Sequence, residues 1–179
     1  MIYIFLANGF EEVEALCPLD ILRRAGLEVK TVGIGGDVIE GSHHITVHAD
    51  LPDFMYNDPA PEMIILPGGM PGARNLDASE VVDSALDTAS KNGAYLTAIC
   101  AAPMVLGKRG YLAGRRATCF PGFEKYLDGA TLADKRVVRD GKVITAAGMG
   151  VALDFGLELV SALKGIDAAE SIRAAVLAD

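Results

Sequence analysis

The sequence predicts an α/β protein in which a mostly parallel β-sheet is covered by helices on both faces. Short continuous apolar runs, typical of strands buried on both faces, alternate with longer segments of helical spacing. Glycines cluster directly after several of these runs, which indicates tight turns at the strand ends. No linker and no internal repeat divides the 179 residues, so we expect a single domain over residues 1–179.

The first elements of this pattern are two buried strands with a helix between them. The apolar run Ile2–Ala7 predicts the first strand, and Leu27–Ile34 predicts the second. The helix predicted over Glu11–Ala25 ends at Gly26, a helix stop signal. Pro18 lies inside that span and predicts a helix that is kinked or divided into two pieces.

The next segment is less regular and then returns to the strand-helix pattern. We expect an extended, half-exposed stretch over His43–Ala49 and an irregular one over Leu51–Pro61, which contains three prolines. A buried strand follows at Met63–Leu66. The next helix is predicted over Ser79–Ser90, with Ser79 as its N-cap.

Cys100 stands between the apolar run Gly93–Ile99, which predicts a buried strand, and Ala101–Leu106, which predicts the start of a helix. Pro103 suits the first turn of that helix, where its missing N–H costs nothing. The cysteine therefore lies on a sharp strand-to-helix turn, as in a nucleophile elbow. Unpaired backbone N–H groups and the positive helix end should favour the thiolate, so we expect a lowered pKa for Cys100.

The C-terminal part should contain a hairpin and two helices. Asp140-Gly141 between two apolar runs is a hairpin signal. The predicted elements are a short strand over Ala117–Phe120, hairpin strands over Arg136–Arg139 and Lys142–Thr145, and helices over Val151–Leu163 and Asp167–Leu177.

Composition restricts the partners and the compartment. The formal net charge is −8, which argues against nucleic acid or an anionic membrane as the main partner. The three cysteines lack the spacing of a disulfide framework, which indicates a reducing compartment. The sequence contains no cluster of cysteines and histidines that would suggest a metal site. The first apolar run is too short for a signal peptide, and no stretch approaches a membrane span. We therefore expect a cytoplasmic protein without metal or organic cofactor.

Three loops should meet at the carboxyl ends of parallel strands, where sites form in open α/β sheets. They are the loops over residues 8–11, 67–69 and 100–101. Gly68 and Gly69 are either a turn that needs glycine or a source of backbone N–H donors for an oxyanion near Cys100. Glu14 is either an acid on a solvated helix face, which its spacing favours, or a protonated partner of the sulfur.

The remaining candidates keep two interpretations each. His43, His44 and His48 are most simply exposed histidines on one extended strand, although one of them could reach a nearby cleft as a base. Gly148 and Gly150 form either a tight turn or part of a pocket wall. Cys17 and Cys119 are interpreted as small core or rim residues, with Cys119 a possible partner for disulfide exchange.

These residues together resemble the ThiJ/PfpI superfamily, especially its branch of parkinsonism-associated protein deglycases and YajL-like proteins. The matching stretches run in the order of the family over nearly the whole chain: residues 7–14, 23–26, 66–69 and 98–103, and Gly148-x-Gly150 with Asp154-Phe155. The resemblance implies a flavodoxin-like three-layer sandwich and a homodimer. It assigns the reactive cysteine to Cys100, the protonated glutamate to Glu14, and the backbone donors to Gly68, Gly69 and Ala101.

The chain departs from the pattern of the family at several positions. Ala101 stands where the protease branch has a histidine, which disfavours peptidase chemistry. Phe120 stands where many deglycase-branch members have a histidine, and Ala102 replaces a common glycine of the elbow. His43 falls near a position often held by arginine at the dimer-facing rim. We expect His43, Phe120, Gly148 and Gly150 to line the pocket rim.

The resemblance implies a cysteine-dependent stress-response protein of the deglycase or glyoxalase type. It would act on methylglyoxal-like dicarbonyls, which are small reactive aldehydes, or on their early adducts with thiols and amines. The alternative is a redox-sensing chaperone whose reactive cysteine is oxidised to sulfinate with little turnover.

Overall fold

The computed structural model describes residues 1–178 and contains the predicted α/β architecture. Within these residues, a seven-stranded sheet has the strand order β10-β11-β7-β6-β1-β2-β5. All neighbouring strands are parallel except β10 and β11, which form the antiparallel hairpin that Asp140-Gly141 predicted. The strands are β1 (Ile2–Leu6), β2 (Val29–Gly33), β5 (Leu51–Pro52), β6 (Met63–Leu66), β7 (Tyr95–Ile99), β10 (Val137–Asp140) and β11 (Val143–Ala146).

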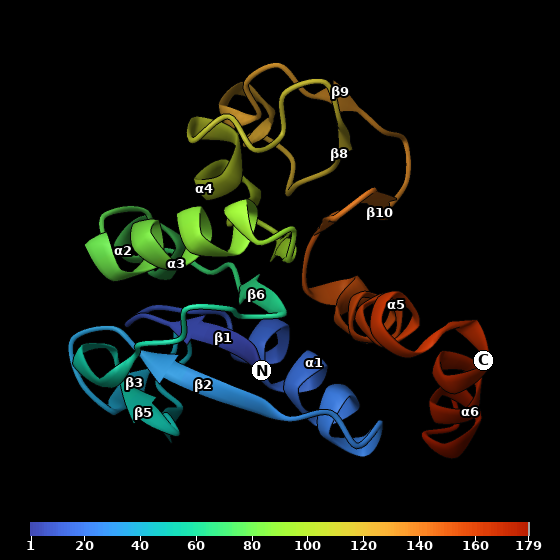
Figure 1. Ribbon diagram of the computed structural model, residues 1–179, viewed down its shortest axis with the longest axis horizontal. Helices are drawn as coiled ribbons and strands as arrows, with labels where there is room; N and C mark the ends of the chain where they lie inside the picture. The colour runs from blue at the N-terminus through green and yellow to red at the C-terminus, as the bar shows by residue number, and fades with distance from the viewer. Residues whose placement is uncertain (179) are drawn as a thin grey trace.

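Helices cover both faces of the sheet, as Figure 1 shows. On one face lie α2 (Gly72–Asp77), α3 (Glu80–Lys91) and α4 (Pro103–Lys108), packed on a core that includes Phe5, Leu66 and Leu86. On the other face lie α1 (Glu12–Arg24), α5 (Ala152–Lys164) and α6 (Ile166–Ala175), over a second core. This is a three-layer α/β sandwich of the flavodoxin-like kind.

Most helix positions follow the predictions, and Ser79 caps α3 as expected, since its side chain accepts a hydrogen bond from the Val82 N–H. Of the two outcomes expected at Pro18, a division into two pieces is wrong, because α1 is continuous from Glu12 to Arg24. The backbone of Pro18 packs against Gly156 of α5, where an added Cβ would lie 3.2 Å from the Pro18 Cα. This close helix contact offsets the hydrogen bond that the proline removes.

Smaller elements correct other expectations. Residues 43–49 do not form one extended strand: β3 (Val38–Glu40) and β4 (Thr46–His48) pair as a hairpin, with His44 in its turn at a φ of 63°. The irregular stretch after β4 holds β5 and the 3₁₀ turn Asp53–Met55. The strand expected over 117–120 is β8 (Arg116–Ala117), which pairs with β9 (Thr131–Leu132).

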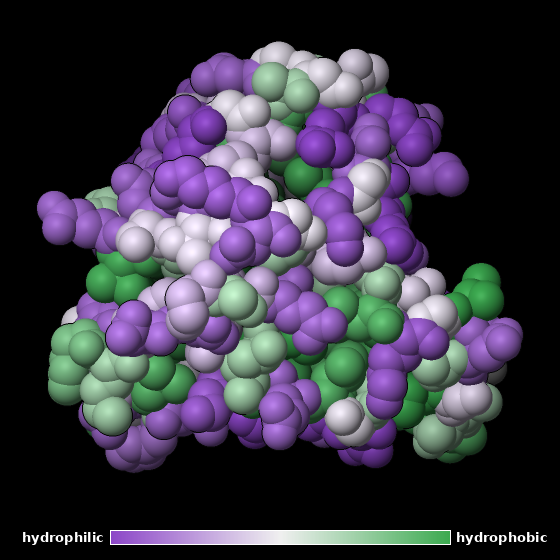
Figure 2. Space-filling view, viewed as in Figure 1, coloured by the Kyte–Doolittle hydropathy of each residue, from purple (hydrophilic) through white to green (hydrophobic). Residues whose placement is uncertain are grey.

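Apolar and polar side chains are interspersed on the surface in Figure 2.

The register of the sheet brings the site loops together. Leu66 of β6 lies beside Ala98 of β7, and Ile99 lies beside Ala146 of β11. The loops that leave β6, β7 and β11 therefore begin at the same edge of the sheet. The loop after β1 joins them, because the Glu11 N–H donates a hydrogen bond to the Gly68 carbonyl at 2.9 Å.

Candidate active site

Cys100 occupies the strand-to-helix turn that the sequence predicts. It directly follows β7, and its φ of 64° is in the left-handed region that few non-glycine residues adopt. Its N–H donates to the Ala146 carbonyl at 2.9 Å, and its carbonyl accepts from the Phe120 N–H at 2.8 Å. These two bonds hold the strained turn, which costs on the order of 1–3 kcal/mol. The half-buried thiol is thereby fixed at the sheet edge.

Glu14 is a buried partner of that thiol and not an acid on a solvated surface. Its side chain extends from the first turn of α1, is 1% exposed, and accepts a hydrogen bond from the Gly68 N–H at 3.0 Å. Burial raises the pKa of Glu14 to about 7, helped by the negative charge of Glu11 and opposed by hydrogen bonding with Cys100 and Gly68. Near neutral pH this carboxyl is therefore poised to gain or lose a proton.

The Cys100 thiol does not have the lowered pKa that the elbow predicts. Burial and the neighbouring Glu14 carboxylate raise it to about 12, against the backbone N–H groups of Gly69 and Ala101, which favour the thiolate. Between the two pKa values the pair holds a single proton. A thiolate then exists only when that proton lies on Glu14. The strand-to-helix turn fixes the position of the sulfur, and the protonation state of Glu14 determines whether the sulfur is charged.

Gly68 is the tightest point of the site. A Cβ at this residue would lie 2.5 Å from the Glu14 Oε2 and 2.6 Å from the Cys100 Cβ, so only glycine fits between the two side chains. Its N–H is already bonded to Glu14, which differs from the predicted role of an oxyanion donor. The N–H groups of Gly69 and Ala101 are the ones directed at the sulfur. Gly69 itself adopts a φ of 84° and packs on the loop after β1.

The predicted rim residues divide into two groups. Phe120 and Gly148 lie at the site: a Cβ on Gly148 would be 3.3 Å from the Phe120 ring and 3.9 Å from the Glu14 Oε1. Gly150 faces Arg136 instead, whose Nη2 is 3.0 Å from the corresponding point. His43 contacts Glu12, with 3.0 Å between its Nδ1 and the Glu12 Oε2. Phe120 and Gly148 thus lie beside the Glu14 carboxyl, and His43 belongs to a neighbouring cluster.

This neighbouring cluster of Glu11, Glu12 and His43 was not anticipated. Glu12 is only 4% exposed, yet it accepts hydrogen bonds from both the N–H and the ring of His43. One ligand atom from each of the three residues lies within 4.8 Å of the others, a spacing that could hold a cation. Both Glu12 oxygens already have partners, so we assign no metal here. Sequence spacing could not reveal the cluster, because the β3–β4 turn brings His43 to α1.

The other two cysteines are less suited to reaction. Cys119 is buried, and burial with the charge of Glu124 raises its pKa to about 11. Burial and the charge of Asp20 raise the pKa of Cys17 as well. All three thiols are free in the described chain. Neither Cys17 nor Cys119 has a buried carboxyl that could take its proton in the way that Glu14 can.

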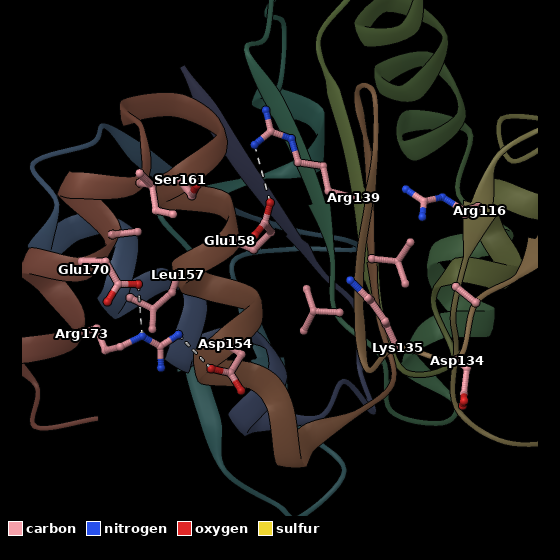
Figure 3. A pocket seen from close by; sticks show the side chains of 15 residues that line it. Arg116, Asp134, Lys135, Arg139, Asp154, Leu157, Glu158, Ser161, Glu170 and Arg173 are labelled. Carbon is pink, nitrogen blue, oxygen red and sulfur yellow. Dashed lines mark hydrogen bonds and ion pairs between the residues drawn. The ribbon is translucent and has the colours of Figure 1, made fainter. Parts of the chain in front are cut away.

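A large cleft lies elsewhere, between β10 and the helices α5 and α6 (Figure 3). Its volume is about 740 Å³, and neither Cys100 nor Glu14 lines it. Its arginines are paired with carboxylates, since Arg139 lies 3.6 Å from Glu158 and Arg173 lies 3.2 Å from Asp154. None of the side chains drawn for this cleft in Figure 3 pairs a nucleophile with a buried carboxyl, so Cys100 and Glu14 remain the candidate site.

The fold and the site define a flavodoxin-like α/β protein with a cysteine at a nucleophile elbow and a buried glutamate beside it. The comparison with family models matches residues 1–162 to the DJ-1/PfpI family. The chain belongs to this family. Within residues 1–178, no helix is long and apolar enough to cross a bilayer.

Individual relatives match over nearly their whole length. Protein dj-1beta of Drosophila melanogaster is 32% identical over 97% of this chain and 95% of its own. A protein of Caenorhabditis elegans named glutathione-independent glyoxalase DJR-1.2 is 31% identical over 90% of this chain and 87% of its own. Among solved structures, oxidized Toxoplasma gondii DJ-1 superimposes with a TM-score of 0.94 at 31% identity, covering 98% of this chain and 97% of that one.

Proposed function

We propose that this protein is a cysteine-dependent enzyme that converts small dicarbonyls such as methylglyoxal, or their early adducts with thiols and amines, into hydroxy acids. The observation that carries the proposal is the buried Glu14 carboxyl beside the Cys100 thiol, with a pKa raised to about 7. A nucleophile, a proton carrier and backbone N–H donors are the groups that such chemistry needs. The C. elegans relative named as a glutathione-independent glyoxalase supports the same reaction class.

The first step is addition of the sulfur to the aldehyde. Glu14 takes the proton of the Cys100 thiol, and the sulfur forms a bond to the aldehyde carbon while the carbonyl π electrons move to oxygen. The N–H groups of Gly69 and Ala101, which favour negative charge at the sulfur, are placed to stabilise the new oxyanion as well. Return of the proton from Glu14 to that oxygen gives a neutral hemithioacetal.

The second stage moves a proton between the two carbons and then releases the product. Glu14, again ionised, removes the proton from the former aldehyde carbon, and the electrons of that C–H bond form an enediolate with its negative charge on the former ketone oxygen. Glu14 returns the proton to the former ketone carbon, and the hydroxyl proton of the former aldehyde carbon passes to the neighbouring alkoxide, which leaves a 2-hydroxy thioester on Cys100. Attack by water breaks the carbon–sulfur bond and yields the hydroxy acid and the free thiol. The aldehyde carbon is oxidised and the ketone carbon is reduced, so no external oxidant or reductant is needed.

A second candidate function is redox sensing through the same sulfur. The Toxoplasma gondii relative is described as oxidized. In this chain the Gly69 and Ala101 N–H groups, and Glu14 when protonated, could donate hydrogen bonds to the oxygens of a Cys100 sulfinate. An oxidant such as a peroxide would supply those oxygens. This role needs an accessible sulfur but no turnover of a carbonyl substrate.

One experiment separates the two candidates. The reduced protein is mixed with methylglyoxal and lactate is measured, with Cys100→Ser as the inactive control and Cys119→Ser as the matched control that keeps the nucleophile. Lactate from the wild type and Cys119→Ser, but not from Cys100→Ser, supports the enzyme. An absence of lactate, together with rapid sulfinate formation on the Cys100 peptide under peroxide, supports the sensor.

The homodimer and the cytoplasmic location expected from the sequence stay proposals. Sedimentation velocity at several protein concentrations would test the dimer, and fractionation of the source cells would test the location.

A further inference from the structure

Two residues next to the Cys100 site, Phe120 and Met149, have large apolar side chains that are exposed to solvent. Phe120 is 47% exposed and Met149 is 53% exposed, although both are large hydrophobic residues. Exposed apolar side chains are common singly, but a pair beside a reactive group indicates a contact surface for a ligand.

The geometry fixes Phe120 relative to the nucleophile. Its N–H donates to the Cys100 carbonyl at 2.8 Å, so the two residues cannot move apart without breaking that bond. The ring edge lies 3.3 Å from the point where a Gly148 side chain would begin, and the Glu14 Oε1 lies 3.9 Å from the same point. The ring edge and the carboxyl therefore lie close together across Gly148, and the exposed part of the ring faces solvent beside the reactive pair.

Met149 borders the same space from the loop after β11. Its backbone lies close enough to Glu14 to lower the pKa of that carboxyl, so the start of its exposed side chain is near the pair. The surroundings of the pair also include the negative charge of Glu11, which raises the pKa of Glu14. This charge disfavours an anionic substituent on the substrate, whereas Phe120 and Met149 favour an apolar one.

We infer that the site selects dicarbonyls that carry a flat, apolar substituent, which Phe120 and Met149 hold while the aldehyde carbon meets Cys100. This inference rests on the proposed function, because it names the substrate class of the same site. Phe120 is the specificity-determining residue in this arrangement. Contact with an aromatic ring contributes on the order of 0.5–1.5 kcal/mol beyond the buried area, which corresponds to about 2- to 12-fold in binding.

The test measures binding at Cys100 without requiring turnover. Phenylglyoxal and methylglyoxal compete with iodoacetamide, and alkylation is read on the Cys100 peptide alone, because dicarbonyls also modify arginine. The protection constants are divided by those for a free thiol such as N-acetylcysteine, which removes the intrinsic difference in reactivity. We expect the wild type to prefer phenylglyoxal, Phe120→Ala to lose about 5-fold of that preference, and Phe120→Leu to lose less. Phe54→Ala is the matched control, since Phe54 is 80% exposed on the 3₁₀ turn after β5.

The outcomes distinguish this inference from the proposed function. Equal normalised protection by the two dicarbonyls, no protection by phenylglyoxal, or an unchanged preference in Phe120→Ala would overturn the inference even if lactate is formed. A Phe120-dependent preference without any hydroxy acid would uphold it and refute the proposed turnover. If Phe54→Ala keeps the preference for phenylglyoxal and Phe120→Ala loses it, the result supports the Phe120 ring as the source of that preference.

Discussion

Glu12 and Glu14 both extend from the first turn of α1 and both are buried, yet their pKa values move in opposite directions. Burial acts against ionisation in each case, but hydrogen bonds from the His43 ring and from backbone N–H groups lower the pKa of Glu12 to about 2. Glu14 has fewer such donors and faces a thiol, so burial raises its pKa to about 7. The donors around each carboxyl and the depth of its burial together decide its charge.

The two sides of this helix end therefore have different properties. On the Glu12 side the charge is fixed and holds the β3–β4 turn to α1 through the His43 N–H at 2.7 Å. On the Glu14 side the charge is variable near neutral pH, as a proton carrier needs. Substitutions that remove one charge at a time should separate a structural carboxylate from a reactive one.

The largest effect is expected for Glu14→Gln. The amide can still accept the Gly68 hydrogen bond but cannot take the thiol proton, so turnover of methylglyoxal should fall by about 100-fold or more. Lactate formation under saturating substrate measures it. Turnover within a factor of two of the wild type would remove Glu14 from the mechanism.

The same substitution should also raise stability above neutral pH. A carboxyl whose folded pKa is raised stabilises the fold below about pH 4.5, and this contribution is lost as the pH passes through about 7. Glu14→Gln removes the unfavourable buried charge, so at pH 8 we expect a gain on the order of 1–2 kcal/mol in the free energy of unfolding. Urea unfolding at pH 8 measures the gain, and a loss of stability there would show that Glu14 does not carry an unfavourable charge.

A graded effect is expected from pH on the unmodified protein. Below the Glu14 pKa of about 7 both members of the pair are protonated, so the carboxyl cannot accept the proton of Cys100. The value of kcat/KM should fall about tenfold for each pH unit below that value and level off above it. Initial rates in constant ionic strength buffers from pH 5 to 9 measure the profile. Glu12→Gln should keep the same step, because its own carboxyl titrates near 2.

The fold could be predicted from the sequence because its strands are covered on both faces. A run such as Met63–Leu66 has every residue buried, and that pattern is visible without a structure. The helix α2 was missed, since six residues that begin Gly72-Ala73 give too little periodicity. The division of α1 at Pro18 was expected because the hydrogen bond that proline removes can be inferred from the sequence. The packing of Pro18 on Gly156 cannot be inferred in that way.

The residues of the candidate site could be predicted from the sequence better than their pKa values. Cys100 could be found from the strand-to-helix junction, and Glu14 was assigned through the resemblance. The direction of the Cys100 pKa could not be predicted, because it depends on a carboxyl that the fold buries against the sulfur. The contact between His43 and Glu12 joins residues 31 positions apart, which no local pattern encodes.

At Glu12, whose carboxylate holds the β3–β4 turn to α1, the substitution Glu12→Gln should leave turnover within about twofold of the wild type. It should lower the free energy of unfolding. A carboxyl with a depressed folded pKa contributes stability above about pH 4.5, and the contribution is lost as the pH falls through about 2. Because His43 is exposed and solvent screens part of the effect, we expect a loss on the order of 2 kcal/mol at pH 7. Urea unfolding at pH 7 and pH 3 measures it, and the two proteins should approach each other at the lower pH.

The smallest effect is expected for His43→Gln. Hydrogen bonding to Glu12 and the charges of Glu11 and Glu12 raise the His43 pKa above 6.5. Its contribution to stability is therefore complete below 6.5 and is lost as the pH rises through the raised value. The variant should unfold at lower temperature than the wild type at pH 5.5, and the difference should shrink by pH 9. A difference that grows with pH would mean that neutral His43 is the stabilising form, and the ion pair with Glu12 would then not hold the turn.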